Sequence, residues 1–445
     1  MQRRELAILS AVALLLSGFG AGFWVCTLQN RDRFSQINSR MSLLEGQINE
    51  LKNPVYTIGI VYPMSGRLDW WARDTQPVIE AAERDLQAML DETGSPVRFN
   101  FLFADSESTG EGALEAVKSL VDEGAQIIVG LPTSGEVDGA LSYIIASGIP
   151  VISPSSTASH LSRPDNVFRL SIPENSRARI GAELALELGY GEVIVIHRDD
   201  GWGSAYAETV STAFTERGLT AHSIAFEPSH TYYMNYSDEV RELEALADEG
   251  ERALVYLVAW ENEDYSILNE ARKSPVLSRV RWFTAALYPT ILERSVMFGM
   301  AEGLRDFALE VGLWAPEQRP IVQPLTIGLM EEARTELGRY PNYEHIYLYD
   351  AVMVAAKAFL TAGCGDSESL TAAIPLVAEQ HFGATGHKEL DLNGDLLTED
   401  MAFIGVVKQG DTYELGYYAF HDGSRNEFSI MDKPRERKWW FSPQA

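Results

Sequence analysis

From Val55 onward, short runs of β-branched and aromatic residues alternate with stretches that carry apolar residues at helical spacing. This alternation predicts a parallel sheet with helices on both faces. Strands are expected at 56–62, 97–104, 126–131 and 150–153, and helices at 75–90, 112–123 and 135–146.

The same rhythm restarts after Phe168 and predicts a second doubly wound unit. Helices are expected at 176–188, 202–217, 236–249 and 264–272, and strands at 192–197, 220–226, 253–260 and 280–284. A long helical stretch follows at 342–362, and the chain from His387 has an antiparallel pattern around a turn at 393–395. The predicted fold is therefore α/β, with two doubly wound parallel-sheet lobes. Such sheets bind ligands beyond the carboxyl ends of their strands, so two facing sheets would form a cleft for a small molecule.

The N-terminal segment has a different pattern. An uncharged, mostly apolar run covers residues 7–28 and follows Arg3 and Arg4. About 20 apolar residues span a bilayer as a helix, and the preceding arginines favour a cytoplasmic N-terminus. Residues 1–29 are thus predicted to be a signal anchor, or transmembrane helix. A cleavable signal peptide is the alternative, because Gly20 and Gly22 precede Phe23.

A heptad stripe follows the apolar run, and polar residues fill most of its gaps. Its apolar members are Phe34, Ile37, Met41, Leu44, Ile48 and Leu51. Residues 30–53 are predicted to form a stalk that separates the globular part from the membrane and pairs with a second copy. The alternative is one amphipathic helix lying on the globular part. The anchor places the chain in the cell membrane with its globular part extracytoplasmic.

Charge and motifs exclude several functions. The chain has 64 acidic and 36 basic residues and a net charge of −28, which argues against nucleic acid as a partner. Its two cysteines form no C-x-x-C pair. The sequence also lacks a G-x-S-x-G elbow, a phosphate-binding loop and an H-E-x-x-H motif. An enzyme is therefore disfavoured, and neither a catalytic residue nor a metal or other cofactor is expected.

Several phrases, in this order along the chain, resemble the leucine/isoleucine/valine-binding proteins and their relatives. They are PMSG at 63–66, VGLPTS at 129–134, PVISPSST at 150–157, YDA at 349–351, FGATG at 382–386 and DLNGD at 391–395. Each phrase is weak alone, and together they cover residues 55 to about 410. The resemblance implies a substrate-binding protein of an ABC importer, with permease subunits as partners and an amino acid or amide-like solute as ligand.

The family's fold, the type I periplasmic-binding-protein fold, joins two lobes by three crossovers. The resemblance places these crossovers near 168–172, 303–307 and 390–395. Lobe 1 would then comprise residues 55–170 plus 305–392, and lobe 2 residues 171–304 plus 393–445.

The resemblance also implies a ligand site in lobe 1. Ser134 matches a hydroxyl that holds the ligand carboxylate at a helix N-terminus, where an anion is favoured. Ser156 and Thr157 match positions that contact the ligand backbone. Without a ligand, all three would be ordinary capping residues. Trp71 matches an aromatic wall residue, although the neighbouring Trp70 could serve instead, and a tryptophan pair is also compatible with core packing.

In lobe 2 the matching aromatic residues are Trp202 and Trp260. One departure from the family concerns the ligand ammonium, because Ala286 stands where the amino-acid binders usually carry an acid. Either another acid replaces it or the ligand is not an ordinary α-amino acid, since a buried ammonium needs an acceptor. The candidate acids are Asp200, Glu261 and Glu263, and Tyr288 is a further residue that could face the ligand.

A second class of function stays open. Receptors of several kinds share this fold, so the chain could instead be a sensory ectodomain that acts through a membrane partner. A retained anchor and stalk suit both functions.

Overall fold

The computed structural model describes residues 53–229, 234–249, 252–286, 301–318, 323–341, 343–398 and 400–436. The predicted anchor, and the stalk up to residue 52, lie outside these ranges. Within them, no single helix has the length and apolar character needed to cross a membrane. The segments Tyr343–Ala362 and Ser367–Gln380 pass that test only as a pair, and they are bent by 117°.

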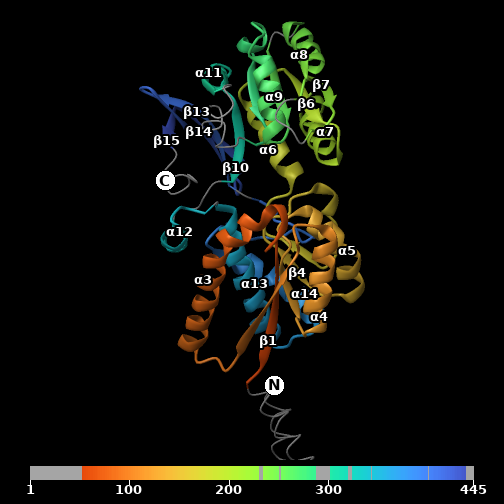
Figure 1. The fold of residues 1–445 in the computed structure, drawn as a ribbon, viewed down its shortest axis with the longest axis vertical. Coiled ribbons are helices and arrows are strands. Elements are labelled where there is room, and N and C mark those ends of the chain that lie inside the picture. Colours follow the sequence, from red (N-terminus) through yellow and green to blue (C-terminus); the bar gives the residue numbers. More distant parts are fainter. Residues whose placement is uncertain are drawn as a thin grey trace, which may run out of the picture. The chain divides into compact units, whose positions relative to one another are not determined.

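The first sheet has five strands in the order β2-β1-β3-β4-β5, and it forms lobe 1 with its helices (Figure 1). Its strands are β1 (Val55–Tyr62), β2 (Arg98–Asp105), β3 (Ile127–Gly130), β4 (Val151–Ser153) and β5 (Val167–Arg169). Its helices are α3 (Asp69–Thr93), α4 (Gly110–Asp122), α5 (Ser134–Ser147), α12 (Pro324–Leu337), α13 (Ile346–Ala362) and α14 (Ser367–Gln380). The pairs β1–β3, β3–β4 and β4–β5 are parallel.

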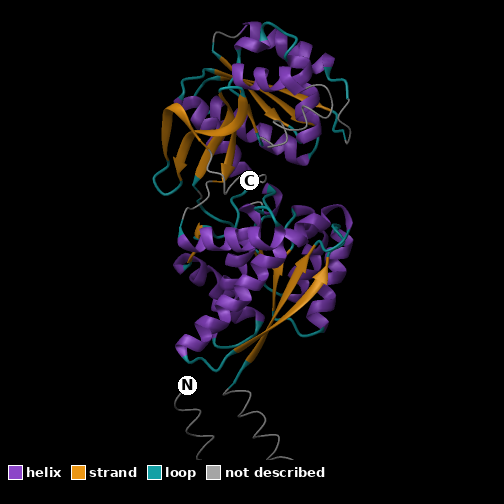
Figure 2. Ribbon diagram, turned by 60° about the vertical axis from the view of Figure 1, so that its left-hand side comes forward, coloured by secondary structure: helices purple, strands orange, loops and turns teal. Residues whose placement is uncertain are grey.

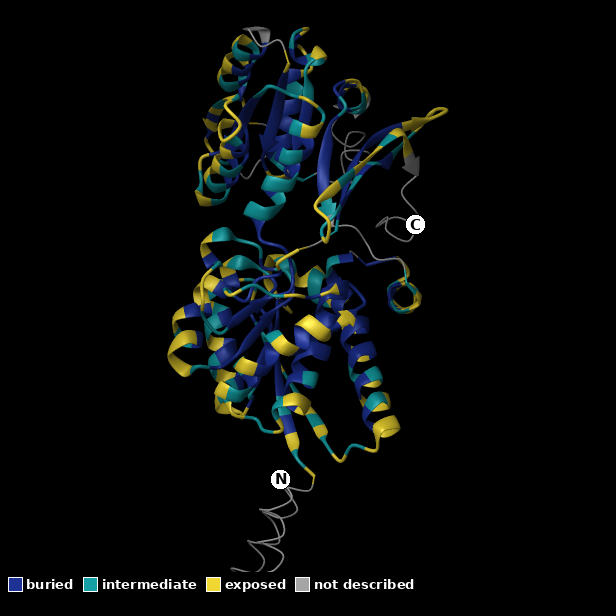
Figure 3. Cartoon of the chain, turned by 180° about the vertical axis from the view of Figure 1, so that it is seen from behind, coloured by how far each residue is buried: buried dark blue, intermediate teal, exposed yellow. Residues whose placement is uncertain are grey.

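Side chains of β1 alternate between two helical layers, as the period of a strand requires. Val61 joins a buried cluster with residues of α4 and α5. On the other face, the ring of Tyr56 stacks on Phe359 of α13, with 4.5 Å between the ring centroids. Both faces of this sheet are therefore covered by helices, and all its strands except the edge strand β2 are largely buried (Figures 2 and 3).

The second sheet has eight strands in the order β15-β14-β13-β10-β9-β8-β6-β7, and it forms lobe 2. Its strands are β6 (Glu192–Arg198), β7 (Thr220–Phe226), β8 (Ala253–Val258), β9 (Arg281–Thr284), β10 (Trp314–Gln318), β13 (Met401–Gln409), β14 (Thr412–Asp422) and β15 (Glu427–Glu436). Its helices are α6 (Glu174–Glu187), α7 (Gly201–Thr215), α8 (Ser237–Glu249), α9 (Glu261–Ala271) and α11 (Ala301–Glu310). All six residues of β8 are buried, because one face packs on α6 and α7 and the other on α8, α9 and α11.

Lobe 2 differs from the expected architecture in two respects. First, its sheet is mixed: β7, β6, β8, β9 and β10 pair in parallel, whereas β13, β14 and β15 extend the sheet in antiparallel fashion. Second, a crossover was expected at 303–307, but α11 and β10 both belong to this lobe. Trp314 pairs with Phe283 of β9 and with Gly405 of β13, so the chain leaves lobe 2 only after Gln318. The sequence WAPEQ hides this strand, because Pro316 and two polar residues are atypical of a buried strand.

The expected crossover segments around Phe168 and around Leu390 are joined to each other. The backbone N–H of Arg169 donates to Gly394 (2.8 Å), and Leu396 donates to the carbonyl of Arg169 (3.1 Å). The guanidinium of Arg169 also pairs with Asp395 (Nη2–Oδ2, 2.7 Å), and both side chains are almost fully buried. Its Nη1 donates to the carbonyl of Ala158 (2.7 Å), which follows the predicted ligand residue Thr157. Arg169 therefore links the crossover segment near 168–172 to the loop that contains Thr157.

The YDA and FGATG phrases meet through one carboxylate. Asp350 of α13 is fully buried and accepts hydrogen bonds from the N–H groups of Ala384 (2.8 Å) and Thr385 (2.7 Å). Burial alone would raise the pKa of this carboxyl, but the hydrogen bond and the charge of His381, with Lys388 and Thr385, hold it below its ordinary value. This pair of family phrases thus has a structural role, which is to fix the small β11–β12 hairpin (Phe382–Gly383 and Gly386–His387) on α13.

Candidate functional site

The predicted lobe 1 residues lie in loops at the carboxyl ends of parallel strands. β3 ends at Gly130 and β4 at Ser153, and each is followed by a predicted site segment. Glu107, Ser108 and Leu131, which follow β2 and β3, have positive φ angles of 52°, 57° and 53°. Non-glycine residues rarely adopt this conformation, and such strain gathers at functional sites. The backbone geometry therefore marks this edge of the sheet independently of the sequence motifs.

Ser134 connects two of these loops. It is the first residue of α5, and the preceding Thr133 is the N-cap, so the Ser134 hydroxyl is not needed for capping. Instead its Oγ accepts from the N–H groups of Thr157 (3.3 Å) and Ala158 (3.1 Å) and lies 3.1 Å from the Ser156 Oγ. The structure thus brings together all three hydroxyl residues that the sequence singled out.

The three hydroxyl groups differ in their availability. Ser156 is fully buried, whereas Thr157 is partly exposed. The Thr157 hydroxyl makes no hydrogen bond with the described residues, although its carbonyl accepts from Glu174 N (2.7 Å). The first N–H groups of α5 are also unused by the helix itself. A free hydroxyl beside a helix N-terminus can bind a carboxylate or a similar anion.

Glu136 supports this arrangement, and the sequence analysis missed it. Its buried carboxylate accepts from the N–H (2.9 Å) and the hydroxyl (2.7 Å) of Thr133 and from the hydroxyl of Ser106. It therefore fixes the start of α5 against the loop after β2. The signal for it was present, because a threonine three residues before a glutamate is a capping box.

Asp105 has a similar role in the PMSG turn. Its Oδ1 accepts from the N–H groups of Met64 (2.8 Å), Ser65 (3.1 Å) and Glu107 (2.8 Å). Burial would raise the pKa of this carboxyl, but the hydrogen bonds outweigh it and lower the pKa. The carboxylate stays charged and holds the turn near the start of α3.

Trp70 and Trp71 both lie in the first turn of α3. Their rings stack at 5.7 Å, and the edge of the His345 ring packs against Trp71 at 5.6 Å. Trp71 is partly buried in lobe 1, whereas Trp70 is 41% exposed. The structure thus leaves Trp70, the alternative to Trp71, as the more available aromatic surface.

In lobe 2, Trp202 and Trp260 also follow the carboxyl ends of strands. Trp202 is partly buried in the first turn of α7, and the centre of its ring lies 6.0 Å from that of Tyr206. Trp260 is 42% exposed and precedes α9, and the guanidinium of Arg198 lies 4.6 Å from the centre of its ring. Both residues are positioned at one edge of the second sheet.

Two of the candidate acids near these tryptophans are already engaged. Arg198 pairs with Asp200 (2.7 Å) and with Glu263, whose side chain is fully buried. Asp200 also caps α7 by accepting from Gly203 N (2.8 Å), and Glu263 accepts from the N–H of Trp260 (3.0 Å). These carboxylates form an ionic cluster with Arg198, so their charges are already compensated within the chain.

Ala286 stands at the position where the family's amino-acid binders usually carry an acid. Ala286 is partly buried, and its carbonyl accepts from the Thr284 hydroxyl (3.1 Å). The Glu261 side chain and Tyr288 lie outside the described residues. No group of three or more acidic, histidine or cysteine side chains in the described ranges is arranged to hold a metal ion.

Comparisons with known proteins identify the family and the fold. The model of the family described as "Receptor family ligand binding region" matches residues 74–409, which is more than half of the chain. The Leu/Ile/Val-binding protein homolog 3 of Brucella melitensis is 24% identical over 167 residues, or 37% of this chain and 45% of that protein. The chain thus matches less than half the length of its curated relatives.

Solved structures share the fold over most of the chain. An ABC transporter substrate-binding protein from Desulfitobacterium hafniense in complex with Leu has a TM-score of 0.61 at 20% identity, covering 81% of this chain and 99% of that one. A solute-binding protein from Rhodopseudomonas palustris in complex with 3,4-dihydroxybenzoic acid has a TM-score of 0.60 at 14% identity, covering 83% and 98%. The chain therefore belongs to the receptor ligand-binding-region family and has the type I periplasmic-binding fold of the leucine-binding proteins.

Proposed function

We propose that this chain is the extracytoplasmic substrate-binding protein of an ABC importer, and that it captures a small solute through a carboxylate. The observation that carries the proposal is the cluster of Ser134, Ser156 and Thr157 at the N-terminus of α5. The Thr157 hydroxyl and the helix N–H groups supply donors for an anion. Trp202 and Trp260, from lobe 2, would close over the rest of the ligand, and the closed form would dock on the permease.

The ligand class follows from the acids. Asp200 and Glu263 are both paired with Arg198, and Ala286 has replaced the usual acid. A buried ammonium without a carboxylate partner would be costly. The ligand is thus proposed to be an amino acid derivative or related polar solute that keeps its carboxylate and lacks a charged α-ammonium.

The test is calorimetric titration of the full chain with a matched set of solutes, namely leucine, leucinamide and 4-methylpentanoate. The carboxylate without an ammonium is expected to bind at least as tightly as leucine, and leucinamide is expected to bind most weakly. At 100 times its dissociation constant, the tightest solute should stabilise the fold by about 2.7 kcal/mol. If leucinamide bound as tightly as 4-methylpentanoate, the anion site would be wrong.

Variants locate the site. The double substitution Ser134→Ala with Thr157→Ala should weaken binding of the best solute at least tenfold. Ser147→Ala is the matched control, because Ser147 is the last residue of the same helix and its hydroxyl bonds to Tyr143, Ile144 and Ile149, outside the hydroxyl cluster. Equal affinity of the double variant and the control would reject the site.

A sensory ectodomain is the second candidate, since the matched family is described as a receptor region. It would bind the same ligand and would signal through a membrane partner. Uptake of the labelled solute by cells separates the two functions. Loss of uptake on deletion of this gene supports import, and unchanged uptake supports sensing.

A further inference from the structure

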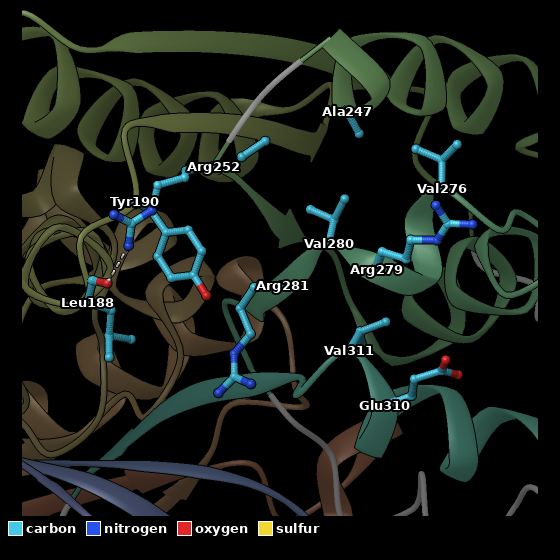
Figure 4. Close-up of a pocket in the computed structure, with 11 residues that line it drawn as sticks. Leu188, Tyr190, Ala247, Arg252, Val276, Arg279, Val280, Arg281, Glu310 and Val311 are labelled. Carbon is cyan, nitrogen blue, oxygen red and sulfur yellow. Dashed lines mark hydrogen bonds between the residues drawn. The ribbon is translucent and has the colours of Figure 1, made fainter.

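A cavity lies in lobe 2, at the edge of the sheet opposite Trp202 and Trp260. It has a volume of about 590 Å³, within the range of small-molecule sites. Its walls come from the starts of β8 and β9, the turn before β6 and the end of α11 (Figure 4). It is thus separate from the proposed solute site, which uses the carboxyl ends of the strands.

The lining of this cavity is cationic, although the chain as a whole carries a net charge of −28. Among the described residues of the lining, Arg252, Arg279 and Arg281 are accompanied by one acid, Glu310, so three positive charges and one negative charge leave a formal charge of +2. Tyr190 adds a phenol to the lining. Burial raises the pKa of this phenol by more than Arg281 and Arg252 lower it, so the hydroxyl keeps its proton at neutral pH. Apolar side chains such as Val276, Val280 and Val311 complete the walls. In Figure 4, Arg252 and Tyr190 lie on one side of Val280 and Arg279 on the other.

None of these three arginines pairs with a carboxylate among the residues that the structure describes. Among the described residues, Arg252 donates only to the Leu188 carbonyl (3.4 Å), and the Arg281 guanidinium stacks on Trp314 at 4.0 Å. The Nε of Arg281 is buried and has no hydrogen-bond partner in the described part of the chain. Burial lowers the pKa of Arg281 by more than its neighbours Tyr190 and Tyr418 raise it.

The two arginines that are fully buried among the described residues have carboxylate partners, whereas Arg281 is partly buried and pairs with no described carboxylate. Arg169 pairs with Asp395, and Arg198 pairs with Asp200 and Glu263. An uncompensated buried charge is costly, and this chain has many acids with which to compensate it. The contrast indicates that the cavity is kept cationic for a group that comes from outside the chain.

Two glycines let the backbone approach these guanidinium groups closely. A Cβ atom at Gly312 would lie 1.8 Å from Nη1 of Arg281, and one at Gly189 would lie 2.9 Å from Nη2 of Arg252. Both glycines have positive φ, at 56° and 81°. The cationic side chains are therefore held in place by the shape of the turns beneath them.

We propose that this cavity binds a small organic anion with an apolar body, through Arg252, Arg279 and Arg281 and the hydroxyl of Tyr190. Guanidinium groups match the oxygens of phosphate and carboxylate, and the valine side chains offer an apolar surface beside them. The site goes beyond the proposed solute capture, because it uses other residues at another edge of the sheet.

Calorimetric titration of the full chain with phenyl phosphate tests the proposal, with inorganic phosphate and phenol as the two halves of the probe. Phenyl phosphate should bind more tightly than either half, and its affinity should fall as sodium chloride is raised. The double substitution Arg252→Gln with Arg279→Gln alters two exposed residues, so folding is preserved, and it should weaken binding at least tenfold. Arg281→Gln should do the same.

Two variants decide where the probe binds. Arg241→Gln removes an exposed arginine of the same lobe that pairs with Asp238, and it should leave binding unchanged. The Ser134→Ala, Thr157→Ala double variant should also retain phenyl phosphate binding. Loss of binding in that variant, or no binding to the unmodified chain, would overturn the proposal, whatever the outcome for the proposed solute site.

Discussion

At the scale of single residues, His345 shows how burial selects one protonation state of a side chain. The Thr75 hydroxyl donates to the carbonyl of Trp71 (2.7 Å), so its oxygen must accept from Nδ1–H of His345 (3.0 Å). Burial lowers the pKa of His345 to about 3, helped by the charge of Arg339, so the imidazole is neutral at pH 7. With its proton on Nδ1, the ring has none on Nε2. Asp74 lies 3.8 Å from Nε2, but Arg339 pairs with that carboxylate at 2.6 Å.

This histidine predicts a loss of stability in mild acid. As pH falls from about 6.5 towards 3, the unfolded chain takes up a proton that the folded chain refuses, so the free energy of unfolding decreases. Between pH 6.5 and pH 5 the loss from this residue should be about 2 kcal/mol. His345→Asn keeps a donor near Thr75 and should reduce this dependence in urea unfolding.

The control for this prediction is His160→Asn, because His160 is exposed and bonds only to the exposed Asp138. The control should keep the pH dependence of the unmodified chain. If both variants lost it equally, the effect would not come from the buried imidazole.

At the scale of elements, α4 and α5 approach each other through glycine. A Cβ atom at Gly139 would lie 2.2 Å from the carbonyl oxygen and 2.3 Å from the Cα of Gly110. This contact fixes α5 against α4 at Gly139. The Ser134 end of α5 therefore has a defined position relative to α4. The contact therefore links helix packing to the geometry of the proposed site.

Two alanine substitutions on the same helix should have opposite effects. Gly139→Ala should lower the free energy of unfolding by about 1–3 kcal/mol, since the helices must separate. Gly135→Ala meets no atom within 4 Å and should be neutral or stabilising by up to about 1 kcal/mol. Urea unfolding of both variants is the measurement, and equal destabilisation would contradict the close packing.

The order of most strands and helices could be predicted from the sequence, because hydrophobic periodicity reports burial directly. Strands β6 and β8, for example, carry unbroken apolar runs that a fully buried parallel strand requires. Strand β10 could not be predicted, since its burial arises from pairing with β9 and β13 and not from its own residues. The hydroxyl cluster was found through motifs. The pairing of Arg198 with Glu263 and Asp200 could not be predicted from the sequence. These partners are 65 and 2 residues away, and the presence of charged residues does not show which of them pair.

At the scale of the whole molecule, the Arg169–Asp395 pair joins segments from distant parts of the chain. It fixes the backbone of β5 to the segment around Gly394, and it holds the loop that contains Thr157 through the Ala158 carbonyl. Both side chains are about 99% buried, so the pair works in a medium where an unpaired charge is costly.

Asp395→Asn should destabilise the fold by about 3 kcal/mol or more, because it leaves the buried Arg169 charge without its partner. The same variant should weaken binding of the best solute, since the loop beside Thr157 loses an anchor. Asp238→Asn is the control, because Asp238 and its partner Arg241 are both largely exposed and surface pairs contribute little. Denaturant unfolding and calorimetry check the two effects, and an unchanged affinity would show that the pair is structural only.

The position of α13 has a consequence for how the chain is made. This helix covers one face of the first sheet, yet its residues 346–362 are synthesised long after β1, β3 and β4. Between those events, ribosome-bound or translocating chains expose an apolar sheet face that only distant residues can cover. Such intermediates fold slowly and aggregate readily. Lobe 1 is therefore completed after the chain has passed through lobe 2, and a chaperone that shields the early segment would raise the yield of native protein.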